Sequence, residues 1–120
     1  MRSTALVILL VALASPALAD SYPVNGRWGV STASAKGPID CSGKRVISFS
    51  GDQRSDSNGG VRDLRNKTVQ PVGTSDYRVT DVFANGQVSN GQVSYTLSIK
   101  DSDHVVLSGQ TGTLKLQRCR

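Results

Sequence analysis

Hydrophobic and polar residues alternate along much of this 120-residue chain after residue 25. The clearest run is residues 93–99, in which Val93, Tyr95, Leu97 and Ile99 alternate with serine and threonine. A period of two residues predicts a β-strand with one buried and one solvated face. The same pattern, with weaker alternation, predicts further strands over residues 26–31, 44–50, 64–72, 76–84, 104–108 and 113–120.

The connections between these strands carry turn residues. Residues 51–60 (GDQRSDSNGG) contain almost no apolar residue and are predicted to form a loop. Asp81 interrupts the apolar parity of Tyr77, Val79 and Phe83, which favours a β-bulge near it. The pentapeptide NGQVS occurs twice within residues 85–94, and either Asn-Gly pair suits a hairpin turn.

The composition points away from helices. The chain has no glutamate, and its part after residue 20 is poor in alanine and leucine. Glycine, serine, valine, threonine, asparagine and aspartate, which favour strands and turns, dominate instead. We therefore expect an all-β fold, a small antiparallel barrel or sandwich of seven or eight strands. The barrel is favoured because closure leaves no exposed strand edge.

The first 19 residues have the features of a secretory signal peptide. Arg2 precedes an apolar run over residues 5–14, and Ala17-Leu18-Ala19 forms a cleavage site before Asp20. The run is too short to span a bilayer and no second one follows. We expect residues 1–19 to be removed, leaving residues 20–120 as a single domain in the periplasm or outside the cell, with no membrane attachment.

The charge excludes a nucleic-acid partner. Removal of Arg2 leaves 13 basic and 9 acidic residues, a net charge of +4, but the two signs alternate along the chain. Binding to nucleic acid or to anionic lipid is typical of runs of like charge. The expected partner is instead a protein or small ligand in the periplasm, bound by a monomer.

Cys41 and Cys119 are the only cysteines. In an exported protein, two cysteines are expected to pair. The chain-entropy model assigns such a long loop about 4.5 kcal/mol of stabilisation. A redox-active pair is typically closer in sequence, as in C-x-x-C, so the bridge is predicted to be structural.

Catalytic and cofactor motifs are few. His104 is the only histidine, with Asp101 and Asp103 beside it, but no serine lies in a G-x-S-x-G elbow. One histidine and two paired cysteines do not form a zinc site, and the aspartates of residues 52–63 lack calcium-loop spacing. We therefore expect no catalysis, metal or cofactor. The alternative is a small periplasmic hydrolase that uses His104.

Candidate binding positions fall into two groups. Arg54, Arg62 and Arg65 lie in or beside the predicted 51–60 loop, where they are suited to an acidic or carboxylate partner. Trp28 and Tyr95 belong either to a filled core or to the floor of a ligand cavity.

Two known families resemble parts of this chain. Gly26-Arg27-Trp28 is similar to the G-x-W of the first strand of lipocalins and other calycins. That resemblance implies a calycin-like barrel in which a basic residue of the last strand, here Arg118, packs across Trp28. The chain also resembles small periplasmic inhibitors of secreted metalloproteases, which begin with G-x-W after a signal peptide. In them an N-terminal arm enters the protease cleft, which implies a binding role here for residues 20–25, with Tyr22 as the anchor and Pro23 holding the arm extended.

The whole-chain pattern is most similar to short exported proteins of Gram-negative bacteria with no assigned function. The segments that carry this resemblance are DCSGKR at 40–45, YRVTD at 77–81 and LQRCR at 116–120. Together these observations predict an exported β-barrel with a non-catalytic binding or inhibitor role. The His104 hydrolase and a purely structural protein of the cell envelope remain alternatives.

Overall fold

The computed structural model describes residues 21–32, 36–85 and 87–120, which form eight β-strands and no helix. The predicted signal peptide, its cleavage site and Asp20 lie outside the described residues. No helix long and apolar enough to cross a membrane occurs in the described ranges. The strands are β1 (Gly26–Val30), β2 (Val46–Ser50), β3 (Gln53–Asp56), β4 (Asp63–Pro71), β5 (Asp76–Phe83), β6 (Gly91–Asp101), β7 (His104–Gly109) and β8 (Gly112–Arg118).

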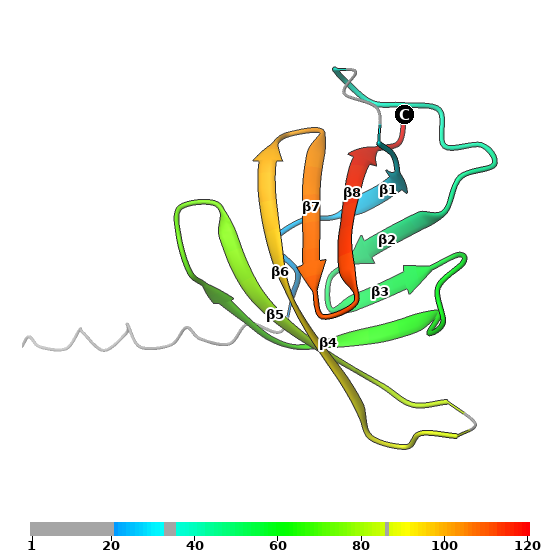
Figure 1. Cartoon of the computed structure of the whole chain (residues 1–120), viewed down its shortest axis with the longest axis vertical. Coiled ribbons are helices and arrows are strands. Elements are labelled where there is room, and N and C mark those ends of the chain that lie inside the picture. The colour runs from blue at the N-terminus through cyan, green and yellow to red at the C-terminus, as the bar shows by residue number, and fades with distance from the viewer. Residues whose placement is uncertain (1–20, 33–35, 86) are drawn as a thin grey trace, which may run out of the picture.

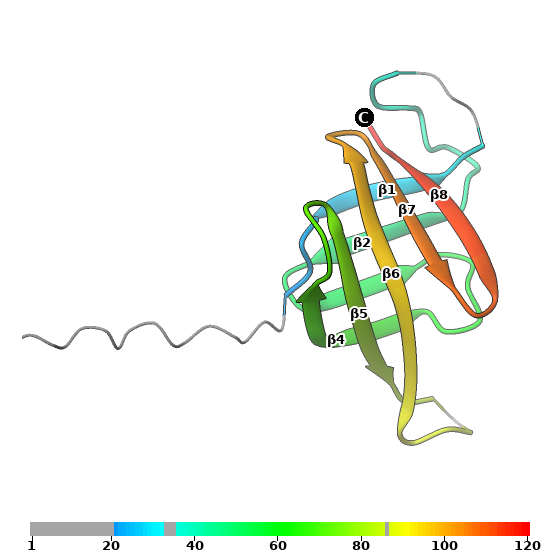
Figure 2. The same cartoon turned by 60° about the vertical axis from the view of Figure 1, so that its left-hand side comes forward.

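The eight strands form a closed antiparallel barrel in which each strand pairs with its neighbours in sequence (Figure 1). β8 closes the barrel against β1, with Trp28 opposite Arg118. Strands β1–β4 run across the direction of β5–β8 in the view of Figure 2. The prediction of an all-β fold is confirmed, and of the two architectures the barrel is correct.

β3 corrects the prediction that residues 51–60 are a loop. Ser48 pairs with Ser55 on one side of this short strand, and Arg54 pairs with Leu64 on the other. The inward positions of β3 are Arg54 and Asp56, each of which forms an ion pair with a side chain of opposite charge. The strand therefore lacks the apolar alternation by which strands are recognised.

The bulge lies opposite Asp81 rather than on its own strand. The register shifts in β4 between Asn66 and Thr68, while β5 pairs continuously with β6. Asp81 keeps the inward parity of Val79 and is completely buried.

Asn90-Gly91 does not form a two-residue turn, because Gly91 already pairs with Phe83 as the first residue of β6. Gly86 of the other Asn-Gly pair lies outside the described residues. Between β5 and β6 the Asn85 side chain accepts hydrogen bonds of 2.8 Å from the backbone N–H groups of Gln87 and Val88.

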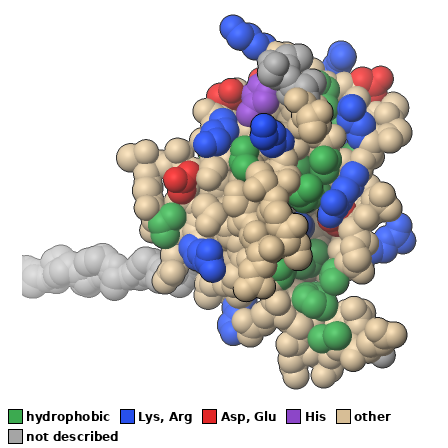
Figure 3. Space-filling view, in the orientation of Figure 1, with side chains coloured by type: hydrophobic (Ala, Val, Ile, Leu, Met, Phe, Trp, Pro, Cys, Tyr) green, Lys and Arg blue, Asp and Glu red, His purple; other side chains and the backbone are tan. Residues whose placement is uncertain are grey.

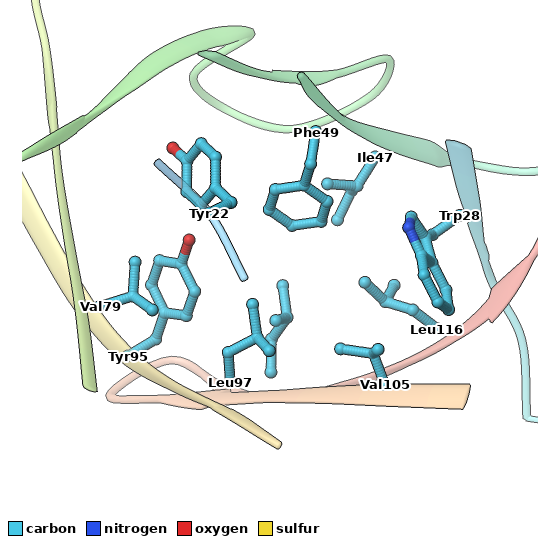
Figure 4. Close-up of a cluster of buried hydrophobic side chains, with 10 residues drawn as sticks. Tyr22, Trp28, Ile47, Phe49, Val79, Tyr95, Leu97, Val105 and Leu116 are labelled. Atoms are coloured by element: carbon cyan, nitrogen blue, oxygen red, sulfur yellow. The ribbon is translucent and has the colours of Figure 1, made fainter. Parts of the chain in front are cut away.

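A row of apolar side chains fills the middle of the barrel (Figure 4). Its completely or almost completely buried members come from six strands and are Trp28, Ile47, Phe49, Val79, Leu97, Val105 and Leu116. Trp28 lies at one side of this row and Tyr22 and Tyr95 at the other.

Ile39 and Cys41, which precede β2, lie beside the C-terminal end of β8 and are held there by the disulfide. Cys41 and Cys119 are bonded, as predicted, with their Cα atoms 5.6 Å apart. Ile39 exchanges backbone hydrogen bonds of 2.8 and 2.9 Å with Arg118 and Arg120. Gly29 faces this segment, and a Cβ atom at its position would lie 2.7 Å from the Cys41 Sγ. The absence of a side chain at Gly29 therefore lets the bridge lie against β1.

Candidate functional site

A buried ion pair lies inside the barrel, next to the apolar row. Arg54 of β3 and Asp81 of β5 have side chains that are 10% and 0% exposed, and the Arg54 Nη1 lies 3.3 Å from the Asp81 Oδ2. The Arg54 guanidinium also lies over the Tyr95 ring, 5.1 Å from its centroid. Burial of two charges is costly unless hydrogen bonds satisfy them, so the partners of each group are informative.

The Asp81 carboxylate is well supplied with donors. The Tyr95 hydroxyl donates to its Oδ2 at 2.7 Å, and the Asn66 Nδ2 donates to its Oδ1 at 3.3 Å. The Asn66 amide also donates to the backbone carbonyls of Thr68 and Thr80, which flank the bulge. The bulge of β4 thus places an amide beside the acid. We call Tyr22, Arg54, Asn66, Asp81 and Tyr95 the inner polar cluster.

Tyr22 joins this cluster from the N-terminal arm. Its backbone N–H donates to the Gly51 carbonyl at 2.9 Å, and its ring packs edge-on against Phe49 at a centroid distance of 4.9 Å. The Tyr95 hydroxyl is directed toward Tyr22 (Figure 4). Burial, followed by the charge of Asp81, raises the pKa of the Tyr22 hydroxyl. Burial likewise raises the pKa of Tyr95, so both hydroxyls stay protonated and able to donate.

Three polar atoms of the inner polar cluster are buried without a hydrogen-bond partner. They are the Tyr22 hydroxyl, the Arg54 Nε and the Asn66 Oδ1. The large majority of buried polar side-chain atoms in proteins have a partner. Three unpartnered atoms in one cluster therefore indicate donor and acceptor capacity that the protein itself does not use.

A cleft of about 810 Å³ leads to this cluster. Arg54 and Tyr95 are among its lining residues, together with the apolar side chains of Val93, Leu107 and Leu114. In Figure 1 the β7–β8 turn lies opposite β3, and Figure 3 shows a band of hydrophobic side chains on this face with lysine and arginine side chains beside it. The cleft thus combines an apolar wall with a buried guanidinium.

Two glycines keep the cleft open at the end of the β7–β8 hairpin. Gly109 pairs with Gly112 across the hairpin and with Tyr95 on β6, so it shares the inward parity of Leu107. A Cβ atom at Gly109 would meet the Tyr95 Cβ at 3.4 Å, which is ordinary contact. Position 109 therefore tolerates a side chain, and that side chain would project beside Tyr95.

A second ion pair stands beside the cleft. The Arg45 guanidinium, which is also part of the lining, donates to the Asp56 carboxylate at 2.9 and 2.6 Å. Burial raises the pKa of Asp56, but the hydrogen bonds from Arg45 and from the Asn58 backbone outweigh it and hold the pKa below its ordinary value. Asp56 is therefore ionised at neutral pH and fixes Arg45.

Several predicted site residues lie elsewhere than expected. The prediction that Tyr22 is an exposed anchor is wrong, because its side chain fills the barrel and is 8% exposed. Pro23 beside it is half-buried. Arg54 does not share a surface with Arg62 and Arg65, because Arg54 points inward. The Arg65 side chain is 65% exposed and lies 3.8 Å from Asp52, while Arg62 donates to the Ser57 carbonyl at 3.3 Å.

Of the three residues proposed as core or cavity, Trp28 and Tyr95 are buried, whereas the Arg118 side chain is 36% exposed. Trp28 is 1% exposed and belongs to the filled core, and the Arg118 guanidinium lies 4.4 Å from the centroid of its ring, as expected. Tyr95 belongs to both the core and the cleft.

His104 lies at the β6–β7 turn, away from the cleft (Figure 1). Its Nδ1 is 2.8 and 3.0 Å from the two Asp101 carboxylate oxygens. Within the described ranges, no three histidine, cysteine or acidic side chains are close enough to hold a metal ion.

Asp81, Asn66 and Asp56 belong to buried polar contacts that were not singled out from the sequence as site residues. The available signal was Asp81 itself, an acid at an apolar position of an otherwise regular strand. No family model, curated protein or solved structure matches this chain.

Proposed function

We propose that this chain is a non-catalytic binding protein that accepts a small molecule in the cleft between the β7–β8 turn and β3. The observation that carries the proposal is Arg54, which lines the cleft while its buried Nε has no partner. Small-molecule sites typically have volumes of about 300–1,000 Å³, mainly apolar walls and a few well-placed polar groups. The cleft of about 810 Å³ lies within this volume range, and its lining mixes the apolar side chains of Val93, Leu107 and Leu114 with polar ones.

The inhibitor role receives less support from the same contacts. An inhibitory arm must leave the barrel to enter a protease, but the Tyr22 side chain is part of the core and its backbone is bonded to Gly51. Release of the arm would expose Tyr22 and Phe49 together. We therefore favour a ligand inside the barrel over a protease around the arm.

The proposal includes an exported location, in the periplasm or outside the cell. It rests on the signal-peptide features of residues 1–19, and the bonded Cys41 and Cys119 are compatible with an oxidising compartment.

The test uses the oxidised protein without residues 1–19 and a neutral fluorescent probe, N-phenyl-1-naphthylamine, whose emission rises in apolar sites. We expect one saturable site on the unsubstituted protein and a loss of at least about tenfold in affinity in Gly109→Val, because the new side chain occupies the cleft beside Tyr95. Gly60→Val is the matched control, since a Cβ atom there meets nothing within 4 Å and Gly60 does not line the cleft. Equal binding by both variants, or no binding at all, would refute the proposal and favour a structural role.

A further inference from the structure

We infer that the ligand is an amphipathic monoanion, with one negatively charged oxyanion group at Arg54 and an apolar body along the wall of the cleft. This inference rests on the proposed binding function and specifies its ligand class. It also identifies Arg54 as the residue that determines specificity for charge.

The sign of the ligand charge follows from the lining of the cleft. Arg45, Arg54 and Arg78 all line it, and none of the described lining residues is acidic. A cleft with low-dielectric walls and one sign of charge concentrates ligands of the opposite sign. The cleft is therefore suited to an anion.

The number of negative charges on the ligand follows from the ion pairs that the lining arginines already form. Asp56 pairs with Arg45 and Asp81 pairs with Arg54. Arg78 forms no ion pair with any described acidic residue. Three arginines and two aspartates leave one uncompensated positive charge, so a single negative charge neutralises the site. A dianion would leave a surplus negative charge beside buried carboxylates, which is costly at low dielectric.

The position of the charged group follows from Arg54. Its guanidinium is held by Asp81 and by the Tyr95 ring, so it is ordered before a ligand arrives. Asp81 is only 3.3 Å from one terminal nitrogen, and the Nε has no partner. The planar guanidinium can donate two parallel hydrogen bonds to an oxyanion, and a lysine ammonium cannot replace it in this geometry. About one tenth of the Arg54 side chain is accessible, and because the Nε itself is buried, a ligand oxygen can approach only the accessible part of this side chain.

An apolar ligand body fits the apolar part of the lining, which lies among polar side chains of serine, threonine and glutamine. Val93 is 38% exposed although it has the inward parity of Tyr95. Leu107 and Leu114 pair across the β7–β8 hairpin on the same inward face. A hydrocarbon or aromatic body in the cleft would cover Val93 and Leu114, since Leu107 is already buried.

The experiment compares two dyes that differ by one sulfonate group, 8-anilino-1-naphthalenesulfonate and the neutral N-phenyl-1-naphthylamine. On the oxidised protein we expect the sulfonate to bind at least about tenfold more tightly, because a hydrogen bond to a charged group is worth about tenfold to a hundredfold in affinity. Near-ultraviolet circular dichroism of each protein confirms that the dyes report on the folded state rather than on a loosened one.

Two variants assign the preference to the cleft. Arg54→Lys keeps a positive charge beside Asp81 but loses the planar donors, so it should remove most of the preference for the sulfonate over the neutral dye. Arg78→Gln changes only an exposed rim residue, so it should weaken sulfonate binding severalfold and reduce its dependence on salt.

The outcomes separate this inference from the binding function. If both dyes bind equally and Gly109→Val abolishes both, the binding function stands and the monoanion inference is wrong. A sulfonate preference that neither Arg54→Lys nor Arg78→Gln alters would also overturn it, because the anion would then bind outside the cleft. If neither dye responds to Gly109→Val, the binding function itself fails.

Discussion

Removal of one hydroxyl group from Tyr22 and from Tyr95 should change stability in opposite directions. Both rings are buried, at 8% and 5% exposure, and both belong to the inner polar cluster. Tyr95 donates to the Asp81 carboxylate at 2.7 Å, whereas the Tyr22 hydroxyl is buried without a partner. The substitutions Tyr22→Phe and Tyr95→Phe delete the same atom from these two environments.

The expected magnitudes follow from those contacts. A hydrogen bond to a charged group contributes about 1.5–3 kcal/mol, so Tyr95→Phe should lower the free energy of unfolding by about 2 kcal/mol. Burial of an unpaired hydroxyl costs about 1–3 kcal/mol, so Tyr22→Phe should raise it by about 1 kcal/mol. In a domain of this size each kcal/mol shifts the Tm by about 4–8 °C. The two variants should therefore differ by more than about 10 °C.

The measurement is denaturant unfolding of the oxidised protein, followed by the fluorescence of Trp28, the only tryptophan and a buried one. Tyr77→Phe is the control, because Tyr77 is partly exposed and should change little. If Tyr22→Phe loses as much stability as Tyr95→Phe, then the Tyr22 hydroxyl has a partner and the account of the cluster is wrong.

Three further experiments test the frame around the site. Gly29→Ala should cost about 1–3 kcal/mol of unfolding free energy in the oxidised protein, because its Cβ would lie 2.7 Å from the Cys41 Sγ; an unchanged denaturation midpoint would contradict this. A double-mutant cycle of Trp28→Ala and Arg118→Ala should show a coupling of about 0.5–2 kcal/mol in the free energy of unfolding, because the Arg118 guanidinium stacks on the Trp28 ring. Additive effects of the two substitutions would contradict this stacking interaction. The lowered pKa of Asp56 means that its contribution to stability is complete above about pH 4 and is lost as the pH falls through the folded-state pKa, so Asp56→Asn should flatten the acid limb of a stability–pH curve; an identical acid limb would refute the assignment.

The sequence by itself determined the features that depend on local pattern. Strict alternation over residues 93–99 identified β6, because every inward position there is apolar. The inward position of Trp28, in the core or at a cavity, and the pairing of Cys41 with Cys119 also followed from residue type and context, and both are present. Such inferences are correct where apolar residues are buried and paired cysteines are bonded, as their own chemistry favours.

Only the tertiary structure decided where the charged residues face. Arg54 lies in a segment without apolar residues, and its inward orientation depends on Asp81, 27 positions away in the chain. The segment was therefore taken for a loop. Asp81 was taken as the sign of a β-bulge because an acid rarely faces a core. Hydrogen-bond donors from three other strands make its burial tolerable.

The position of Tyr22 likewise depends on contacts with residues that are distant in the chain. The residues before β1 carry no strand pattern, so nothing local distinguishes an arm that projects from one that enters the barrel. The choice is made by the Phe49 ring and the Gly51 carbonyl, which the fold brings to it. A buried polar site whose residues come from distant strands forms only when the barrel closes. No single segment of the chain supplies the hydrogen-bond partners that its own buried charged groups need.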